Sequence, residues 1–410
     1  MKLHCDINLP ASKSESNRAL MIAAYGGFNA DFQNLSDSND TRILANALQE
    51  IKQNNSLIDI ADCGTAARFL TTFLACRKGE WLLTGTERMQ QRPIVPLVEA
   101  LRGLGFDIQY VEKLGCLPLR IKGKPISGGK VQIEMHQSSQ FASSLLLAAP
   151  MWPQGLEMEL FGELSSLPYL DMTLAIMQHF GAAAKRNERT IVVEPKPYQP
   201  ANFKVSSDWS AASYWYEIAA LSEECEIRLQ GLCGPSTGSG SLSLQGDAII
   251  AEWMKSLGVS AIEKGGSLVL TKAPFEKQPL HFDFSATPDL FPTIAATCAG
   301  LQLEARFSGI ANLVLKESNR VEAMKTELGK IGARLEYVSE NELVLKPTEE
   351  LPFYHKNQPL HFASHDDHRI VMALAPLSMK VGQVAFDCLE TVGKSYPRFW
   401  LDAGFLQVQA

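Results

Sequence analysis

The sequence predicts an α/β protein of two domains, each made of three pseudo-repeats with helices inside and sheets outside. Three observations support this prediction. The chain of 410 residues is longer than one hydrophobic core normally serves. A helix–strand–strand pattern and a strand–loop–helix pattern both recur along it. Their spacing is too long and irregular for a solenoid. An ordinary two-domain α/β protein is the alternative that these patterns leave open.

The first pattern is an amphipathic helix that ends at a glycine and precedes two short strands. In its last copy, Val321, Met324, Leu328 and Ile331 keep one apolar face, and Gly332 is expected to cap the helix in a left-handed conformation. The copies are RPIVPLVEALRGLGFDIQYVEKLGCLPLRIKG, LDMTLAIMQHFGAAAKRNERTIVVE, GDAIIAEWMKSLGVSAIEKGGSLVLT and NRVEAMKTELGKIGARLEYVSENELVLKP.

The second pattern is an alternating strand that runs through a polar loop into a helix of small and apolar residues. Such helices carry Ala and Ser where surface helices carry Glu and Lys, so we expect them to be buried on most sides. The copies are INLPASKSESNRALMIAAY, IDIADCGTAARFLTTFLA, VQIEMHQSSQFASSLLLAAP, FKVSSDWSAASYWYEIAAL, LHFDFSATPDLFPTIAATCAG and LHFASHDDHRIVMALAPLSM. A domain boundary is expected near Lys204 to Asp208, halfway through these copies. The Ser/Gly-rich stretch at 235–241 is predicted to be a surface loop.

Composition and charge exclude several classes of protein. The formal net charge of -7 argues against a surface that binds nucleic acid, so any anion site must be local. No apolar run reaches the length of a membrane span, and the N-terminus lacks a secretory signal, which predicts a cytoplasmic protein. Eight cysteines without a C-x-x-C pair favour incidental thiols over a disulfide framework or a zinc site.

Cations stand at helix starts, where the positive end of the helix dipole favours anions. Lys13 and Arg18 lie in the first turns of the helix that LPASKSESNRAL begins, and Arg68, Arg320 and Arg369 stand in similar positions. A single such cation is usually a solvated side chain. Recurrence at four helix starts predicts a ligand with several negative charges, held by side chains and by backbone N–H groups together.

Two further stretches carry groups suited to small organic anions. Arg88 and Arg92 precede a helix that we expect to begin at Pro93, and guanidinium groups bind phosphate or carboxylate through paired hydrogen bonds. HQSSQF supplies Ser138, Ser139 and Gln140, which suit a phosphate or hydroxyl groups, although a serine that caps a helix is the simpler interpretation.

Asp289 and Glu317 are carboxylates placed beside these cations. They can serve as general acid or base, or they can only balance charge. HFASHDDH contains ligand types for a metal, but their spacing guarantees no common centre, so we expect no metal. The residues concerned are His361, His365, Asp366, Asp367 and His368. The sequence has no phosphate loop, dinucleotide fingerprint or serine nucleophile elbow, which disfavours ATP, NAD and acyl-enzyme chemistry.

Taken together, these stretches resemble the 5-enolpyruvylshikimate-3-phosphate synthase family of the shikimate pathway. The resemblance runs nearly end to end. In order, the matching stretches are LPASKSESNRAL, GTAARFL, RMQQRPI, SSQFASSLLLAAP, PYLDMTL, PDLFPTIA, KESNRVEAMKTEL, DHRIVMALAP and GKSYPRF.

The resemblance implies a two-domain inside-out α/β barrel, with 13–206 as an inserted domain and 1–12 with 207–410 as the second. It implies a carboxyvinyltransferase of aromatic amino acid biosynthesis that transfers the enolpyruvyl group of phosphoenolpyruvate to the 5-hydroxyl of shikimate 3-phosphate and releases phosphate. No cofactor, metal, nucleic acid or membrane partner is expected, and we expect a monomer.

The resemblance also implies roles for single residues. Asp289 and Glu317 would transfer protons. Shikimate 3-phosphate would bind Lys13, Ser14, Arg18, Ser138, Ser139, Gln140, Ser166, Asp289, Asn312 and Lys316. Phosphoenolpyruvate would bind Lys13, Gly64, Arg92, Gln140, Arg320, Arg369 and Lys394.

Some positions depart from the family pattern. Asp62 stands where Asn is usual, Leu167 where Lys is usual and Phe69 where Pro is usual, and 235–241 looks inserted. An unpaired Asp62 would weaken anion binding. Two alternatives remain at this point: an enolpyruvyl transferase that acts on UDP-N-acetylglucosamine, whose loop cysteine RMQQRPI lacks, and a non-catalytic module that binds anions or RNA ends.

Overall fold

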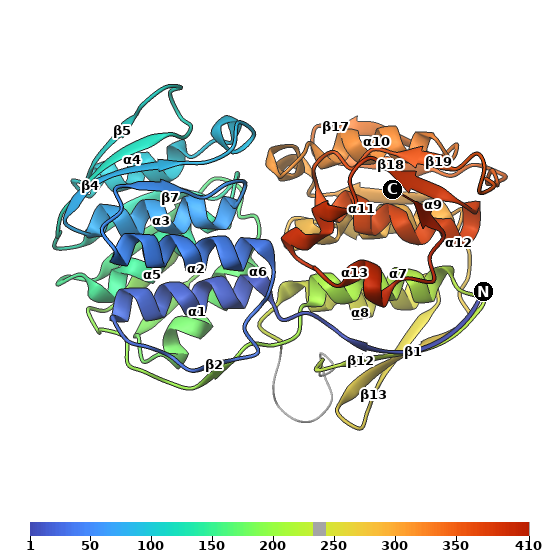
Figure 1. Cartoon of the computed structure of the whole chain (residues 1–410), viewed down its shortest axis with the longest axis horizontal. Helices are drawn as coiled ribbons and strands as arrows, with labels where there is room; N and C mark the ends of the chain where they lie inside the picture. The colour runs from blue at the N-terminus through green and yellow to red at the C-terminus, as the bar shows by residue number, and fades with distance from the viewer. Residues whose placement is uncertain (233–242, 410) are drawn as a thin grey trace. The chain divides into compact units, whose positions relative to one another are not determined.

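The chain folds into two compact units. The computed structural model describes residues 1–232 and 243–409, so the predicted loop at 235–241 lies outside the described residues. Unit 1 comprises Met1–Ala11 and Ser206–Ala410, and unit 2 comprises Ser12–Val205. Along the chain, unit 2 therefore interrupts unit 1 after its first strand (Figure 1).

Four of the described sheets share one strand order, a parallel pair followed by two antiparallel strands. Unit 2 has the orders β3-β4-β6-β5 and β7-β8-β10-β9, and unit 1 has β1-β12-β14-β13 and β15-β16-β18-β17. In unit 2 the strands are β3 (Leu57–Asp59), β4 (Gly79–Thr84), β5 (Asp107–Tyr110), β6 (Leu119–Gly123), β7 (Gly129–Glu134), β8 (Leu156–Phe161), β9 (Ala184–Asn187) and β10 (Thr190–Val193). In unit 1 they are β1 (Lys2–Asn8), β12 (Glu224–Gln230), β13 (Val259–Lys264), β14 (Ser267–Lys272), β15 (Leu280–Asp283), β16 (Ala305–Ser308), β17 (Arg334–Ser339) and β18 (Glu342–Lys346).

Each unit also has one smaller parallel sheet. In unit 2 it pairs β2 with β11, and in unit 1 it has the order β19-β20-β21. The strands are β2 (Phe32–Gln33), β11 (Phe203–Lys204), β19 (Leu360–Phe362), β20 (Val384–Phe386) and β21 (Val408–Gln409).

All six strand–loop–helix copies are confirmed. Their helices follow β1, β3, β7, β11, β15 and β19, the fifth after a short 3-10 turn at η5 (Pro288–Leu290). They are α1 (Lys13–Gly26), α3 (Gly64–Cys76), α5 (Ser139–Ala148), α7 (Trp209–Leu221), α9 (Phe291–Gly300) and α11 (His368–Leu374). The polar loop supplies the N-cap in most of them, for example Ser12, whose side chain accepts a hydrogen bond from Glu15 N.

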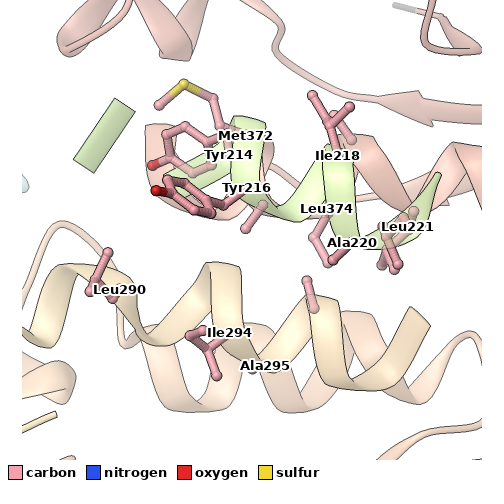
Figure 2. Close-up of a cluster of buried hydrophobic side chains, with 14 of the residues drawn as sticks. Tyr214, Tyr216, Ile218, Ala220, Leu221, Leu290, Ile294, Ala295, Met372 and Leu374 are labelled. Carbon is pink, nitrogen blue, oxygen red and sulfur yellow. The ribbon is translucent and has the colours of Figure 1, made fainter. Parts of the chain in front are cut away.

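These helices form much of the core, as their small residues predict. Every residue of α9 and of α11 is buried. Alanines let the helix backbones approach closely, and larger side chains fill the space that remains between the helices. Figure 2 shows this in unit 1, where Tyr216 and Leu221 of α7, Ile294 of α9 and Leu374 of α11 lie in one apolar cluster.

The remaining helices are more exposed, and one of their predicted starts is wrong. The helix expected at Pro93 begins at Val95, because Ile94 is not helical (φ -137°, ψ 8°). The left-handed cap predicted at Gly332 is confirmed: Gly332 has φ +83°, its N donates to the carbonyl oxygen of Gly329 (3.0 Å), and Ala333 N donates to that of Leu328 (3.2 Å), which closes the end of the helix that begins at Arg320. The helices are α2 (Asn39–Lys52), α4 (Val95–Gly103), α6 (Leu167–His179), α8 (Ile250–Trp253), α10 (Arg320–Gly329), α12 (Ser378–Val381) and α13 (Phe399–Asp402).

Candidate active site

Lys13 opens α1 and makes a buried ion pair. Its Nζ lies 3.0 Å from Asp40 Oδ2, and the two side chains are 12% and 3% exposed. Asp40 belongs to the first turn of α2, so the pair joins the starts of two helices. An anion that binds Lys13 therefore competes with the Asp40 carboxylate. The sequence analysis did not identify this ion pair.

Arg18 lies one turn further along α1 and is bonded to neutral groups. Its Nε donates to Thr173 Oγ1 (2.7 Å), and its terminal nitrogens donate to the carbonyl oxygens of Ser14 (2.9 Å) and Tyr169 (3.1 Å). The Phe69 ring centroid is 5.7 Å from the guanidinium carbon. Burial lowers the pKa of Arg18 to about 10, which leaves it charged at neutral pH.

Two guanidinium groups crowd the start of α3. A Cβ atom added to Gly64 would lie 2.7 Å from an Arg92 nitrogen and 2.8 Å from an Arg68 nitrogen. Arg68 also donates to the carbonyl oxygen of Gly64 at 3.0 Å, and the Nε of Arg92 is buried without a hydrogen-bond partner. Two like charges beside a positive helix end favour a bound anion. Glycine is therefore required at this position to leave room for both arginines.

The start of α5 lies beside the start of α3. Ser138 caps α5 by accepting from Gln140 N at 3.2 Å, and Gln140 Nε2 donates to Thr65 Oγ1 at 3.4 Å. Ser139 is buried. Ser166, directly before α6, has a left-handed backbone (φ 56°) and makes no capping hydrogen bond with its side chain. A non-glycine residue in this conformation is strained, and such strain is concentrated at functional sites.

Unit 2 thus gathers the first turns of five helices. The pairs that join them are Lys13–Asp40 for α1 and α2, Cys63–Asp40 for α3 and α2, Gln140–Thr65 for α5 and α3, and Arg18–Tyr169 for α1 and α6. Helix ends of the same sign add their partial charges to those of Lys13, Arg18, Arg68 and Arg92. This end of unit 2 is suited to binding a multiply charged anion.

Arg320 is the centre of the charged cluster in unit 1. It opens α10, its side chain is 1% exposed, and it makes ion pairs with Asp289 (2.9 Å), Glu317 (2.7 Å) and Asp367 (2.8 Å). Their negative charges outweigh the effect of burial and raise the pKa of Arg320. Asp367 is fully buried and also caps α11, so it ties the two helix starts together.

Asp289 is held by two arginines. Besides Arg320, Arg369 donates to its second oxygen at 2.7 Å. Burial alone would raise the pKa of Asp289, but the charges of Arg369, Arg320 and Lys316 outweigh it and hold that pKa below its usual range. Asp289 and Glu317, the carboxylates predicted to transfer protons, therefore both contact the guanidinium group of Arg320. The charge of Lys316 also acts on Asp289.

The other predicted residues of unit 1 are Asn312 and Lys394. Asn312 lies in η6 (Ala311–Leu315), and its buried Oδ1 has no hydrogen-bond partner. Lys394, at the end of η8 (Glu390–Lys394), is 5% exposed. A buried amide oxygen without a partner is costly unless a ligand satisfies it, which favours a binding role for Asn312.

Asp247 is a candidate that the sequence analysis missed. It is buried in η3 (Gly246–Ile249), and Ser210 donates a short hydrogen bond to it. Burial and the charge of Asp289 raise the pKa of Asp247 to about 7. No local signal distinguishes this aspartate, because the burial that changes it comes from long-range packing.

The three departures from the family pattern occupy different environments. Phe69 is buried and stacks on Arg18, as described above. Leu167 opens α6 and is half-buried, and Asp62 is exposed just before Cys63, the N-cap of α3. Arg88 is exposed directly before η1 (Met89–Gln91).

The described residues contain neither a metal-binding cluster nor a membrane-spanning helix. In the described part of the chain no three His, Cys, Asp or Glu side chains cluster in a way that could hold a metal ion. His361 is exposed on β19, whereas His368 is buried in α11. None of the described helices combines the length and apolar composition needed to cross a bilayer.

The chain is similar to known 3-phosphoshikimate 1-carboxyvinyltransferases over nearly its whole length. The family model for EPSP synthase (3-phosphoshikimate 1-carboxyvinyltransferase) matches residues 51–402. A 3-phosphoshikimate 1-carboxyvinyltransferase of Bacteroides fragilis is 42% identical over 408 residues, covering 98% of this chain and 96% of that protein. One from Histophilus somni is 35% identical over 425 residues, covering 96% and 94%.

A solved structure has a similar fold. An EPSP synthase from Acinetobacter baumannii superposes with a TM-score of 0.74 and 21% sequence identity, covering 99% of this chain and 96% of that one.

Proposed function

The chain belongs to the EPSP synthase family, which catalyses enolpyruvyl transfer in the shikimate pathway, and we propose that it carries out this transfer itself. Its substrates would be phosphoenolpyruvate and shikimate 3-phosphate, and inorganic phosphate would be released. The observation that supports this most is Arg320, which holds the two carboxylates suited to proton transfer.

The charges of unit 2 suit the substrates. Shikimate 3-phosphate and phosphoenolpyruvate each carry a phosphate and a carboxylate, and unit 2 offers Lys13, Arg18 and Arg92 together with helix starts. Within unit 1, Arg320, Arg369 and Lys394 are the cations for phosphoenolpyruvate. Residues of both units would take part in the reaction.

The chemistry requires proton transfers in both the addition and the elimination step. The 5-hydroxyl oxygen of shikimate 3-phosphate bonds to C2 of phosphoenolpyruvate and loses its proton, while C3 gains one, which gives a tetrahedral ketal phosphate. That intermediate then loses a proton from C3 and breaks its bond to phosphate. Asp289 and Glu317 are the groups to exchange these protons. The steps need no metal, nucleotide or covalent nucleophile.

Substrate binding would make Asp289 a better base. While Arg320 and Arg369 hold it, its lowered pKa makes it a weak proton acceptor. An anionic substrate that binds these arginines competes for their charge, which raises the pKa of Asp289 toward a useful value. The carboxylate would therefore become basic only when phosphoenolpyruvate is bound.

The test is phosphate release from phosphoenolpyruvate in the presence of shikimate 3-phosphate. The unmodified protein should release phosphate, and Asp289→Asn and Glu317→Gln should lose about 10²- to 10⁴-fold in kcat. Both variants should still bind the substrates in calorimetry, because the cations remain. Release with UDP-N-acetylglucosamine but not with shikimate 3-phosphate, or normal rates in both variants, would reject the proposal.

We extend the proposal to the architecture. Each unit would be an inside-out arrangement of three repeats. Two observations support this. Two sheets in each unit share one strand order, and of the six helices in the strand–loop–helix copies, three precede Val205 and three follow it. A monomer in the cytoplasm stays a prediction from the sequence.

A further inference from the structure

The loop between β19 and α11 is strained. His365 (φ 53°) and Asp366 (φ 52°) are consecutive non-glycine residues with a left-handed backbone. Each such residue costs free energy, so the conformation persists only where surrounding contacts impose it. This loop contains most of the HFASHDDH stretch, none of whose residues has a role in the proposed reaction.

Helix α10 holds the loop at both ends. Arg320, its first residue, binds Asp367, and Glu327, two turns later on the same face, binds the start of the loop. Glu327 Oε2 accepts from Ala363 N at 3.0 Å, and Glu327 Oε1 lies 2.9 Å from His365 Nε2. A carboxylate can only accept, so the His365 ring donates this hydrogen bond.

Glu327 is a buried side chain that stays ionised in the folded protein. It is 1% exposed, and Lys330 Nζ lies 2.6 Å from its Oε2. Burial alone would raise the pKa of Glu327, but the hydrogen bonds from His365, Lys330 and Ala363 outweigh it and lower that pKa. A buried carboxylate with three donors is well ordered, so it can impose the geometry of the loop.

The end of the loop sets the position of Arg369. Asp367 accepts from Arg369 N at 3.0 Å and so caps α11, and Arg369 extends its guanidinium group to Asp289 at 2.7 Å. A shift of the loop would move Asp367, the start of α11 and Arg369 together. The contact between Arg369 and Asp289 therefore depends on the hydrogen bonds that Glu327 makes.

We propose that Glu327 and His365 are positioning residues, which hold the strained 363–366 loop so that Arg369 stays aligned with Asp289 and with phosphoenolpyruvate. This inference rests on the proposed function, in which Arg369 binds that substrate. Neither residue would touch a substrate.

The test compares steady-state kinetics of Glu327→Gln and His365→Ala with those of the unmodified protein. We expect kcat/KM for phosphoenolpyruvate to fall about 10- to 100-fold, since a misplacement near 1 Å can cost this much. The KM for shikimate 3-phosphate should change less than about twofold, since Arg369 is not among its proposed ligands. His365→Gln keeps a donor of similar reach and should recover part of the loss.

Glu322→Gln is the matched control. It makes the same change on the same helix, but Glu322 is exposed and pairs only with Lys325 and Tyr337 in the described contacts. Its kinetics should be unchanged. If Glu327→Gln fails to fold, as judged by circular dichroism, His365→Ala decides the question, because His365 is partly exposed.

The outcomes separate the two claims. No phosphate release by the unmodified protein with both substrates would reject the proposed function. An active enzyme in which Glu327→Gln and His365→Ala both keep normal kcat/KM for phosphoenolpyruvate would overturn only the positioning role. An equal rise of both KM values would also overturn it, since that would indicate a general structural effect.

Discussion

The buried arginines of the two units have different kinds of partners. In unit 1, Arg320 lies among Asp289, Glu317 and Asp367, so its charge is more than matched by carboxylates. In unit 2, Arg18 bonds to hydroxyl and carbonyl oxygens and stacks on a ring. In the proposed function, unit 1 would hold the groups that exchange protons, and unit 2 would keep positive charge available for an anionic ligand.

This difference predicts that the buried arginine of unit 1 contributes mainly to stability and that of unit 2 mainly to binding. A buried ion pair is costly to break because it leaves an uncompensated charge. A buried arginine with only neutral partners contributes less to folding, so its presence is better explained by the ligand. The comparison predicts opposite balances of stability and affinity for the same substitution in the two units.

The largest expected effect is that of Arg320→Met. Its removal leaves three carboxylates close together, which should lower the free energy of unfolding by about 3–5 kcal/mol in a urea titration. Arg306→Met in the same unit breaks only an exposed pair with Glu342 and should cost about 0–1 kcal/mol. Similar losses in both variants would contradict the importance of the matched cluster.

The buried Asp247 predicts how the stability of unit 1 depends on pH. Its folded pKa of about 7 lies above the unfolded value near 3.9, so the fold favours the protonated form. The stability from this group is full below about pH 4 and is lost as pH rises to about 7, on the order of 4 kcal/mol. Asp289, Arg369 and Asp208 share this environment.

The measurement for Asp247 is urea unfolding at several pH values between 4 and 8. Asp247→Asn should lack the part of the decline that Asp247 causes, and so gain stability relative to the unmodified protein as pH rises. Parallel pH profiles for the two proteins would show that Asp247 does not titrate in this range.

Arg18→Met tests the unit 2 side of the comparison. The loss of its hydrogen bonds to Thr173, Ser14 and Tyr169 should cost about 1–3 kcal/mol of unfolding free energy, less than Arg320→Met costs. The KM for shikimate 3-phosphate should rise at least about tenfold, since a hydrogen bond to a charged group is lost. A variant with normal KM and a large stability loss would make Arg18 a structural residue.

The smallest effect is expected for Gly64→Ala. The added methyl group would displace the Arg92 and Arg68 guanidinium groups, so KM for phosphoenolpyruvate should rise about tenfold, or about 1.4 kcal/mol. Gly103→Ala is the control, because a Cβ there meets nothing within 4 Å. An unchanged KM in Gly64→Ala would show that the arginines can move without loss.

Local patterns predicted much of the protein. The alternation of strand and helix follows from hydrophobic periodicity, and helix starts follow from capping residues that act within three positions. For this reason the sequence placed Lys13, Ser139 and Arg320 at helix starts, where they lie. It placed the start of α4 wrongly at Pro93, because the conformation of Ile94 depends on the chain around it.

Tertiary structure alone decided which residues these cations meet. Lys13 finds Asp40 27 positions away, Arg320 finds Asp367 47 positions away, and Arg18 finds Thr173 155 positions away. Periodicity tells which face of a helix is buried but not which helix covers it. Charge balance, pKa shifts and the Glu327–His365 contact all depend on that covering element, since Coulomb and desolvation energies follow distance in space and not along the chain.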